Sequence, residues 1–204
     1  MNGLSLVNLS FLKNGPYNLT IEAGECIGLT GRSGVGKTQL LRAVADVIAH
    51  DGDCVLNGTS CLSVSPPEWR SMVAMVPAES FWWYDTVGAH FDSGMERYNS
   101  MELLETLGFS PDVMNWQISR LSTGERQRLA LVRTLITEPK VLLLDEPTAS
   151  LDKQMVDVVE QLLADICFLR RTMCIWVSHD IEQLSRVAAR VFRVEKDGFT
   201  EETC

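Results

Sequence analysis

The pattern of apolar and polar positions predicts a strand, a loop and a helix near the start of the chain. Residues 26–29 form a short apolar run that reads as a buried strand, and a glycine-rich stretch follows it. Beyond that stretch, Leu40, Leu41, Val44 and Ile48 recur at the spacing of one helical face. The pattern therefore favours a strand–loop–helix unit between residues 26 and 48.

A second apolar run, at residues 141–144, is typical of a central parallel strand that is buried on both faces. Asp145 and Glu146 follow it directly, and open α/β sheets bind their ligands at the ends of such strands. The stretch CIWVSHD, residues 174–180, reads as another strand that ends at His179. Strand–helix alternation after Lys140 thus indicates the α/β class.

Helical patterns dominate residues 79–136. Ser122 suits a helix N-cap, and Glu125 three residues later completes a capping box. One apolar face of the helix that follows is formed by Leu129, Val132, Leu135 and Ile136. This is either only a well-capped amphipathic helix, or an anion site in which Ser122 and Gly124 stand at a helix N-terminus.

Composition adds limits on partners and location. The 204 residues are 46% apolar and 22% charged, which suits one globular domain. A formal net charge of −9 argues against a nucleic-acid partner, which normally requires a basic face. No segment approaches the roughly 18 consecutive apolar residues that span a bilayer, and the start lacks the layout of a signal peptide. We therefore expect a cytoplasmic chain that contacts a membrane only through a partner.

The cysteines lack the spacing of a metal site. No C-x-x-C pair occurs among the six, so buried and reduced thiols are favoured over a zinc site. They are Cys26, Cys54, Cys61, Cys167, Cys174 and Cys204.

Residues 31–38 carry the pattern G-x-x-x-x-G-K-T in the strand–loop–helix context that a phosphate loop requires. Its glycines let backbone N–H groups curl around an anion, and the helix N-terminus adds partial positive charge. Lys37 would reach the β- and γ-phosphates, and the Thr38 hydroxyl would bind Mg²⁺. The residues expected to touch the nucleotide are Gly31, Arg32, Ser33, Gly34, Val35, Gly36, Lys37, Thr38 and Gln39. Kinases, GTPases and ATPases share this loop, so the loop by itself leaves the reaction open.

The two acids after residues 141–144 suit phosphate chemistry. Asp145 fits Mg²⁺ ligation, either directly or through a bound water. Glu146 can polarise a water for attack on the γ-phosphate, and such a base contributes about 10²–10⁴-fold. The alternative is an exposed acidic turn.

Together and in this order, the motifs closely resemble the nucleotide-binding domain of ATP-binding cassette (ABC) proteins. Residues 31–38 resemble the Walker A loop, and LSTGE at residues 121–125 resembles the family signature. VLLLDEP resembles Walker B with its catalytic glutamate at Glu146, and SLD, ending at Asp152, resembles the D-loop. His179 matches the switch histidine.

The resemblance implies a two-lobed P-loop NTPase fold within one domain, residues 1–204. An ATP-binding core, residues 1–78 and 137–204, would have a mostly parallel sheet and a small antiparallel β region near the N-terminus. A helical signature subdomain, residues 79–136, would be inserted into it.

The family also implies an ATPase that hydrolyses ATP with Mg²⁺ in a homodimer. Walker A of one subunit faces the signature of the other, so Ser122 and Gly124 would touch the γ-phosphate bound by the partner's Lys37. Asp152 would lie at the same interface. His179 would contact the γ-phosphate and the attacking water.

In the family, such a subunit powers transport through a separate transmembrane permease, at the inner face of the cell membrane. The permease would dock near the aromatic residues 81–84, each of which is either exposed or part of the core. The sequence most resembles compact cassettes of iron- or metal-export transporters. The alternatives are a non-transport ABC ATPase and an ATP-dependent regulatory module with weakened hydrolysis.

Three positions depart from the family pattern. Ala78 stands where the family usually has a glutamine that contacts Mg²⁺ and water, and Glu79 is the nearest substitute. Thr123 replaces the first glycine of the signature. The aromatic residue that stacks on adenine is not evident, and Phe11 or Tyr17 is the candidate.

Overall fold

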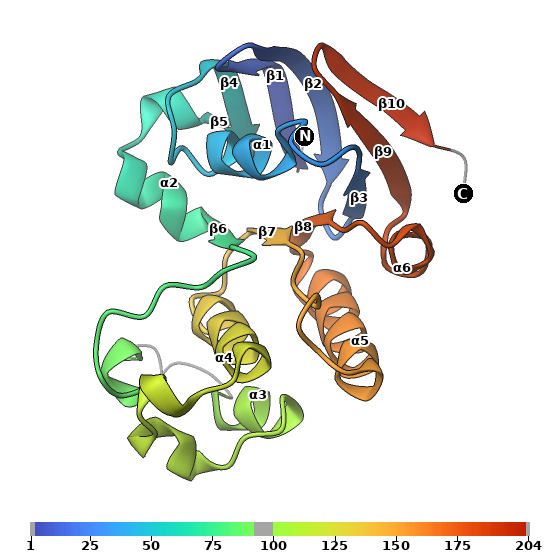
Figure 1. Cartoon of the computed structure of the whole chain (residues 1–204). Coiled ribbons are helices and arrows are strands. Elements are labelled where there is room, and N and C mark those ends of the chain that lie inside the picture. Colours follow the sequence, from blue (N-terminus) through green and yellow to red (C-terminus); the bar gives the residue numbers. More distant parts are fainter. Residues whose placement is uncertain (1–2, 92–99, 203–204) are drawn as a thin grey trace.

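The computed structural model describes residues 3–91 and 100–202, and it contains two β-sheets (Figure 1). The first sheet has four strands in the order β2-β1-β4-β5, and all of its pairs are antiparallel. Its strands are β1 Gly3–Phe11, β2 Asn14–Glu22, β4 Asp51–Leu56 and β5 Thr59–Ser60. Alternating burial along β2 shows that one face packs on the core while the other meets solvent. The predicted antiparallel region is confirmed.

The second sheet has six strands in the order β10-β9-β3-β8-β7-β6. Its strands are β3 Cys26–Thr30, β6 Val73–Val76, β7 Val141–Asp145, β8 Met173–Val177, β9 Arg190–Glu195 and β10 Gly198–Glu202. Every neighbouring pair is parallel except β9 and β10. The prediction of a mostly parallel core sheet is therefore confirmed.

Strand β7 is buried along its whole length, and its first four residues, 141–144, are apolar. Val141 and Leu143 belong to a core cluster shared with α1, Lys37–Val44. Leu142 and Leu144 belong to a second cluster on the other face, shared with α4, Thr123–Leu135, and α5, Lys153–Arg170. Figure 1 shows α1 beside the antiparallel sheet, and α4 and α5 on the opposite side of β7 and β8. The sequence reading of residues 141–144 is confirmed.

Helix α2, Pro66–Met72, is fixed to α1 through one tryptophan. Trp69 is fully buried, and its indole Nε1 donates a hydrogen bond to the Val44 carbonyl at 2.9 Å. A large apolar body with a satisfied polar atom packs without a desolvation penalty.

In its described residues, the interval between β6 and β7 combines α-helices with short 3-10 helices. It contains η2 Gly88–His90, α3 Ser100–Thr106, η3 Pro111–Asn115, η4 Ile118–Arg120 and α4. Residues 77–87 form no helix, and Thr86 instead makes an antiparallel bridge to Gln117. The capping box is confirmed, since Ser122 Oγ accepts from Glu125 N while Glu125 Oε2 accepts from Ser122 N.

Helix α6 spans Ile181–Val187, and the short 3-10 helix η1 spans Cys61–Ser63. Within residues 3–91 and 100–202, no helix is both long and apolar enough to cross a bilayer. The five cysteines in this part of the chain are free thiols, four of them buried, as the sequence predicted, and Cys204 lies outside it. These five are Cys26, Cys54, Cys61, Cys167 and Cys174.

Candidate nucleotide-binding site

The phosphate loop lies between the end of β3 and the start of α1. Gly36 occupies the N-cap of α1 with φ 111°, a conformation that favours glycine. An added Cβ would also lie 2.6 Å from Asn14 Nδ2, so the Asn14 side chain would have to move away. Gly31 has φ 142°, and an added Cβ would lie 2.9 Å from the Val194 carbonyl oxygen. The predicted loop conformation therefore needs glycine at both positions.

Asn14 braces this loop from the hairpin between β1 and β2. Its Nδ2 donates a hydrogen bond to the Val35 carbonyl at 2.6 Å. Sequence reasoning missed Asn14, because the two residues are 21 positions apart and no local motif links them. The brace orients the loop so that its N–H groups can converge on an anion.

Lys37 and Thr38 begin α1 inside the loop. The Lys37 side chain donates to the Gly31 carbonyl at 2.8 Å and to the Arg32 carbonyl at 3.4 Å. Burial lowers the pKa of Lys37, while the charges of Glu146 and Asp145 act in the opposite direction. A cation beside two acids suits stabilisation of phosphate charge.

The Thr38 hydroxyl donates a hydrogen bond to Asp145 Oδ2 at 2.8 Å. Asp145 is 4% exposed at the end of β7, so its carboxylate is held in place by the sheet. A hydroxyl and a carboxylate side by side are oxygen donors of the kind that Mg²⁺ prefers. This pair fits the predicted magnesium site.

Glu146 follows β7 in a left-handed conformation with φ 49°. Its N–H donates to the Val177 carbonyl at 3.1 Å, and its own carbonyl accepts from Gln127 Nε2 at 2.7 Å. These two bonds hold a backbone conformation that costs a non-glycine residue free energy. Gln127 thereby connects α4 to the acid, and sequence reasoning missed this role because the contact is tertiary.

The Glu146 carboxylate faces His179. Glu146 Oε1 lies 3.5 Å from His179 Nε2 and, within the described part of the chain, accepts no hydrogen bond. Burial raises the pKa of Glu146 above 4.5, and the nearby charge of His179 opposes that shift. A carboxylate with a raised pKa and a free lone pair is suited to accept a proton near neutral pH.

These groups share one cavity of about 350 Å³. Its lining comes from the loop, the ends of β7 and β8, and the segment after β6. The lining residues are Ser33, Gly34, Gly36, Lys37, Thr38, Gln39, Ala78, Asp145, Glu146, Val177 and His179. The predicted contacts Gly31, Arg32 and Val35 are not part of this lining. The carbonyl oxygens of Gly31 and Arg32 instead accept hydrogen bonds from the Lys37 side chain. Ala78 faces the cavity at the expected glutamine position, whereas Glu79 is not part of the lining.

Three further predicted contacts lie outside this lining. Ser122 caps α4, and Asp152 caps α5 by accepting from Met155 N at 3.0 Å. Gly124 packs against the D-loop segment so closely that an added Cβ would lie 2.8 Å from the Ser150 carbonyl oxygen. The chain therefore does not bring Ser122, Gly124 and Asp152 into its own phosphate cavity.

The expectation that Phe11 stacks on adenine is not met. Phe11 is only 2% exposed, and its ring stacks on the fully buried Tyr17 with centroids 5.6 Å apart. Both rings belong to the core beneath the first sheet, so neither presents a free face to a base. Burying both apolar rings stabilises the fold more than leaving one of them exposed for a base. A short sequence motif cannot show which of these two positions an aromatic ring takes.

The aromatic segment after Ala78 is largely on the surface. Phe81, Trp83 and Tyr84 are 75%, 63% and 51% exposed, whereas Trp82 is half-buried against the second core cluster. Exposed aromatic rings that gather on one segment are typical of an interaction surface, whereas single exposed apolar residues are common on any protein.

His90 and Arg133 hold this segment in shape. His90 Nε2 accepts hydrogen bonds from the backbone N–H groups of Trp83 and Tyr84 at 2.9 and 3.0 Å. The Arg133 guanidinium lies 4.4 Å from the Trp82 ring centroid, and it donates to the Phe81 carbonyl. The backbone that carries the exposed rings is therefore held in one conformation by the side chains of His90 and Arg133.

Comparison with known proteins agrees with this geometry. A family model described as ABC transporter matches residues 15–149. The aliphatic sulfonates import ATP-binding protein SsuB of Pseudomonas entomophila is 33% identical over 181 residues, covering 87% of this chain and 66% of that protein. SsuB of Yersinia pestis is 34% identical over 185 residues, covering 87% of this chain and 65% of that protein. The chain thus spans about two thirds of the length of these relatives.

Solved structures share the fold. The ATP-binding cassette MJ0796, described as a dimer in a post-hydrolysis state with ADP and Pi, superposes with TM-score 0.83 at 23% identity, covering 100% of this chain and 98% of that one. A bacterial Atm1-family ABC exporter with ATP bound gives TM-score 0.81 at 19% identity, covering 98% of this chain and 38% of that one. The two curated relatives are named for sulfonate import, so they support the family and not the narrower likeness to metal exporters. The chain belongs to the ABC transporter family and has the fold of its ATP-binding cassette.

Proposed function

We propose that the chain is the ATP-hydrolysing subunit of an ABC transporter and that it powers transport through a separate transmembrane permease. One observation carries the proposal. Lys37, Thr38, Asp145, Glu146 and His179, which come from three separate segments, line a single cavity at the carboxyl ends of parallel strands. That is the place where α/β sheets of this kind bind nucleotides.

The residues have distinct roles in hydrolysis. Lys37 neutralises charge on the β- and γ-phosphates, and the loop N–H groups orient them. Thr38 and Asp145 would hold Mg²⁺, which supplies charge stabilisation when bound. Glu146 Oε1 accepts the proton of the attacking water, and His179, 3.5 Å away, contacts the same water and the γ-phosphate.

The proposed enzyme works as a homodimer with ATP between the subunits. Support comes from the position of Ser122 and Gly124, which lie outside the cavity formed by their own chain. Ser122 stands at the N-terminus of α4, where a helix favours an anion. In a two-fold dimer these groups, with Asp152 nearby, meet the nucleotide held by the other copy. The MJ0796 cassette, which shares the fold, is described as dimeric.

The proposed docking surface for the permease comprises the exposed rings of Phe81, Trp83 and Tyr84. Aromatic residues are enriched at interfaces because they bury a large area with few rotatable bonds. Docking there would hold the cassette at the cytoplasmic face of the membrane, as a peripheral subunit. Names of the sulfonate-import relatives favour import of a small solute over the metal export suggested by the sequence. The division into a core, residues 1–78 and 137–204, and a signature lobe, residues 79–136, is part of the proposal.

Co-purification followed by an activity assay tests this function. We expect an adjacent reading frame to encode a multi-span membrane protein. The cassette is expressed with that protein, and ATP hydrolysis is measured with candidate solutes. We expect a stable complex whose hydrolysis is stimulated by one solute and is lost in a Lys37→Ala variant. A complex that forms but hydrolyses no ATP, or a cassette that never co-purifies, contradicts the proposal.

A further inference from the structure

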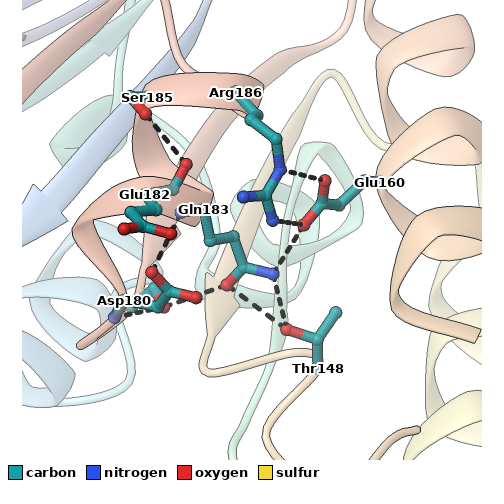
Figure 2. Close-up of polar contacts among 8 residues, drawn as sticks. Thr148, Glu160, Asp180, Glu182, Gln183, Ser185 and Arg186 are labelled. Atoms are coloured by element: carbon teal, nitrogen blue, oxygen red, sulfur yellow. Dashed lines mark hydrogen bonds and ion pairs between the residues drawn. The ribbon is translucent and has the colours of Figure 1, made fainter. Parts of the chain in front are cut away.

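Gln183 is a buried amide at the centre of a polar network (Figure 2). It lies in α6, is 4% exposed, and contacts side chains from three other segments. Its Nε2 donates to Thr148 Oγ1 and to Glu160 Oε1, both at 2.9 Å. Its Oε1 accepts from Ser178 Oγ at 2.9 Å. The hydrogen-bonding capacity of the amide is thus used within the protein.

Two of these partners adjoin the groups proposed for hydrolysis. Thr148 lies two residues after Glu146, and Ser178 directly precedes His179. The turn that carries His179 is tightened further, because Ser178 Oγ also accepts from Asp180 N at 3.1 Å. A single side chain therefore ties the loop of Glu146 to the loop of His179, whose reactive atoms are 3.5 Å apart.

The third partner fixes the direction of the amide. Glu160 on α5 accepts from Arg186 Nη2 at 2.8 Å and from Arg186 Nε at 3.1 Å (Figure 2). Although burial opposes ionisation, the hydrogen bonds from Arg186 and Gln183 leave the pKa of Glu160 below 4.5. An ionised carboxylate only accepts hydrogen bonds, so Nε2 of Gln183 must face Glu160 and Oε1 must face Ser178. A carboxylate in place of this amide would face Glu160 with like charge.

We propose that Gln183 is a positioning residue for ATP hydrolysis, which holds Glu146 and His179 in register by bonding Thr148 and Ser178 with one amide. The inference rests on the proposed function. Gln183 is not part of the lining of the nucleotide cavity, so it acts through the two loops. Displacement of catalytic groups by about 1 Å costs on the order of 100-fold in rate, so loosening this tie lowers kcat more than it lowers nucleotide affinity.

The test compares three variants with the wild type in steady-state ATPase and nucleotide-binding assays. Gln183→Met keeps the approximate volume and removes the hydrogen bonds, and Gln183→Glu adds repulsion with Glu160. In the third variant, Gln183→Glu is combined with Glu160→Gln, which exchanges the donor and the acceptor. The matched control is Gln161→Met, because Gln161 is an exposed glutamine of α5 whose amide bonds Asp165 four residues away.

We expect both single Gln183 variants to lower kcat by roughly 10- to 100-fold, while KM and the Kd for ATP stay within about threefold of wild type. The double variant recovers part of kcat, and Gln161→Met matches wild type. Unchanged kcat in folded Gln183 variants overturns the inference. So does a loss of kcat that only parallels a loss of ATP binding, or the absence of recovery in the double variant.

If Gln183→Met fails to fold, Thr148→Val keeps the shape of that side chain, removes its hydrogen bond to Gln183 and gives the same readout. A smaller fall in kcat at unchanged Kd supports the inference, and wild-type kcat refutes it. A wild-type cassette that does not hydrolyse ATP at all contradicts the proposed function instead, so the two failures are distinguishable.

Discussion

Replacing Glu146 with glutamine separates the proposed proton-accepting role of this side chain from its size. Glutamine keeps the shape of the side chain at the end of β7 but cannot take a proton from water. ATP binding depends on Lys37, Thr38 and the loop backbone, which the substitution does not touch. We therefore expect Glu146→Gln to bind ATP and to favour an ATP-bound dimer without turning over.

The expected loss follows from the position of the carboxylate. Glu146 Oε1 is buried 3.5 Å from His179 Nε2, in the geometry of a general base. Such a base contributes about 10²–10⁴-fold, which corresponds to roughly 3–5 kcal/mol of activation free energy. The rate of the wild type should rise with pH as Glu146 loses its proton, and this rise should disappear in the variant.

The thermal stability of the wild type should fall over the pH range in which its hydrolysis rate rises. Because burial raises the pKa of Glu146 above 4.5, the folded protein binds this proton more tightly than the unfolded chain does. Ionisation therefore reduces stability as pH rises from 4.5 through the folded pKa. Glu146→Gln removes this cost, so the variant should have the higher Tm at neutral pH, with a difference that vanishes below pH 4.5.

Three assays on purified cassette check these expectations: phosphate release, ATP binding, and thermal denaturation across pH. Glu138→Gln is the matched control, since Glu138 also has φ 49° but pairs with Arg170 at 3.4 Å, away from the cavity. It should retain wild-type kcat. Near-normal hydrolysis in Glu146→Gln would refute the assignment of the base, and an equal loss in both variants would trace the effect to the backbone.

Three further substitutions test other parts of the account. Ala78→Gln places an amide in the cavity and should raise ATP hydrolysis by the complex with its membrane subunit; an unchanged rate means that another group already supplies this contact. Trp83→Ala should weaken co-purification with that subunit, whereas Phe168→Ala, an 82% exposed ring on α5, should not, and equal effects would contradict the proposed docking surface. Ser122→Ala should cost about 1 kcal/mol and lower Tm by about 2–4 °C, and an unchanged melting curve would show that the cap contributes nothing.

Local spacing was sufficient to predict the phosphate loop, β7 and the capping box. Each depends on residues within one turn, strand or helix start, where the chain's own periodicity and backbone preferences decide the structure. The same motifs, taken in order, predicted the ABC fold and the meeting of Lys37, Asp145, Glu146 and His179. Their positions in the sequence also indicated that Ala78 occupies the expected glutamine position, and in the structure Ala78 is part of the cavity lining.

Contacts between distant residues were decided only by the tertiary structure. From the sequence, Phe11 could either stack on adenine or belong to the core, and burial of apolar area against Tyr17 decided for the core. Gln127 and Gln183 are not among the predicted site residues, and both are 4% exposed. Each must satisfy its amide, because an unpaired polar group in the interior is costly.

The sequence by itself therefore determined which groups are candidates for the chemistry of the site: those expected to bind phosphate, to hold the metal and to accept a proton. Tertiary packing decided which residues support those groups and which aromatic rings remain exposed. The physical reason is that motif residues act through local backbone geometry, whereas burial and hydrogen-bond partners depend on segments that meet only after folding. Gln183 is an example, since its amide donates a hydrogen bond to Thr148, 35 positions away. This contact helps to join the loop of Glu146 to the loop of His179.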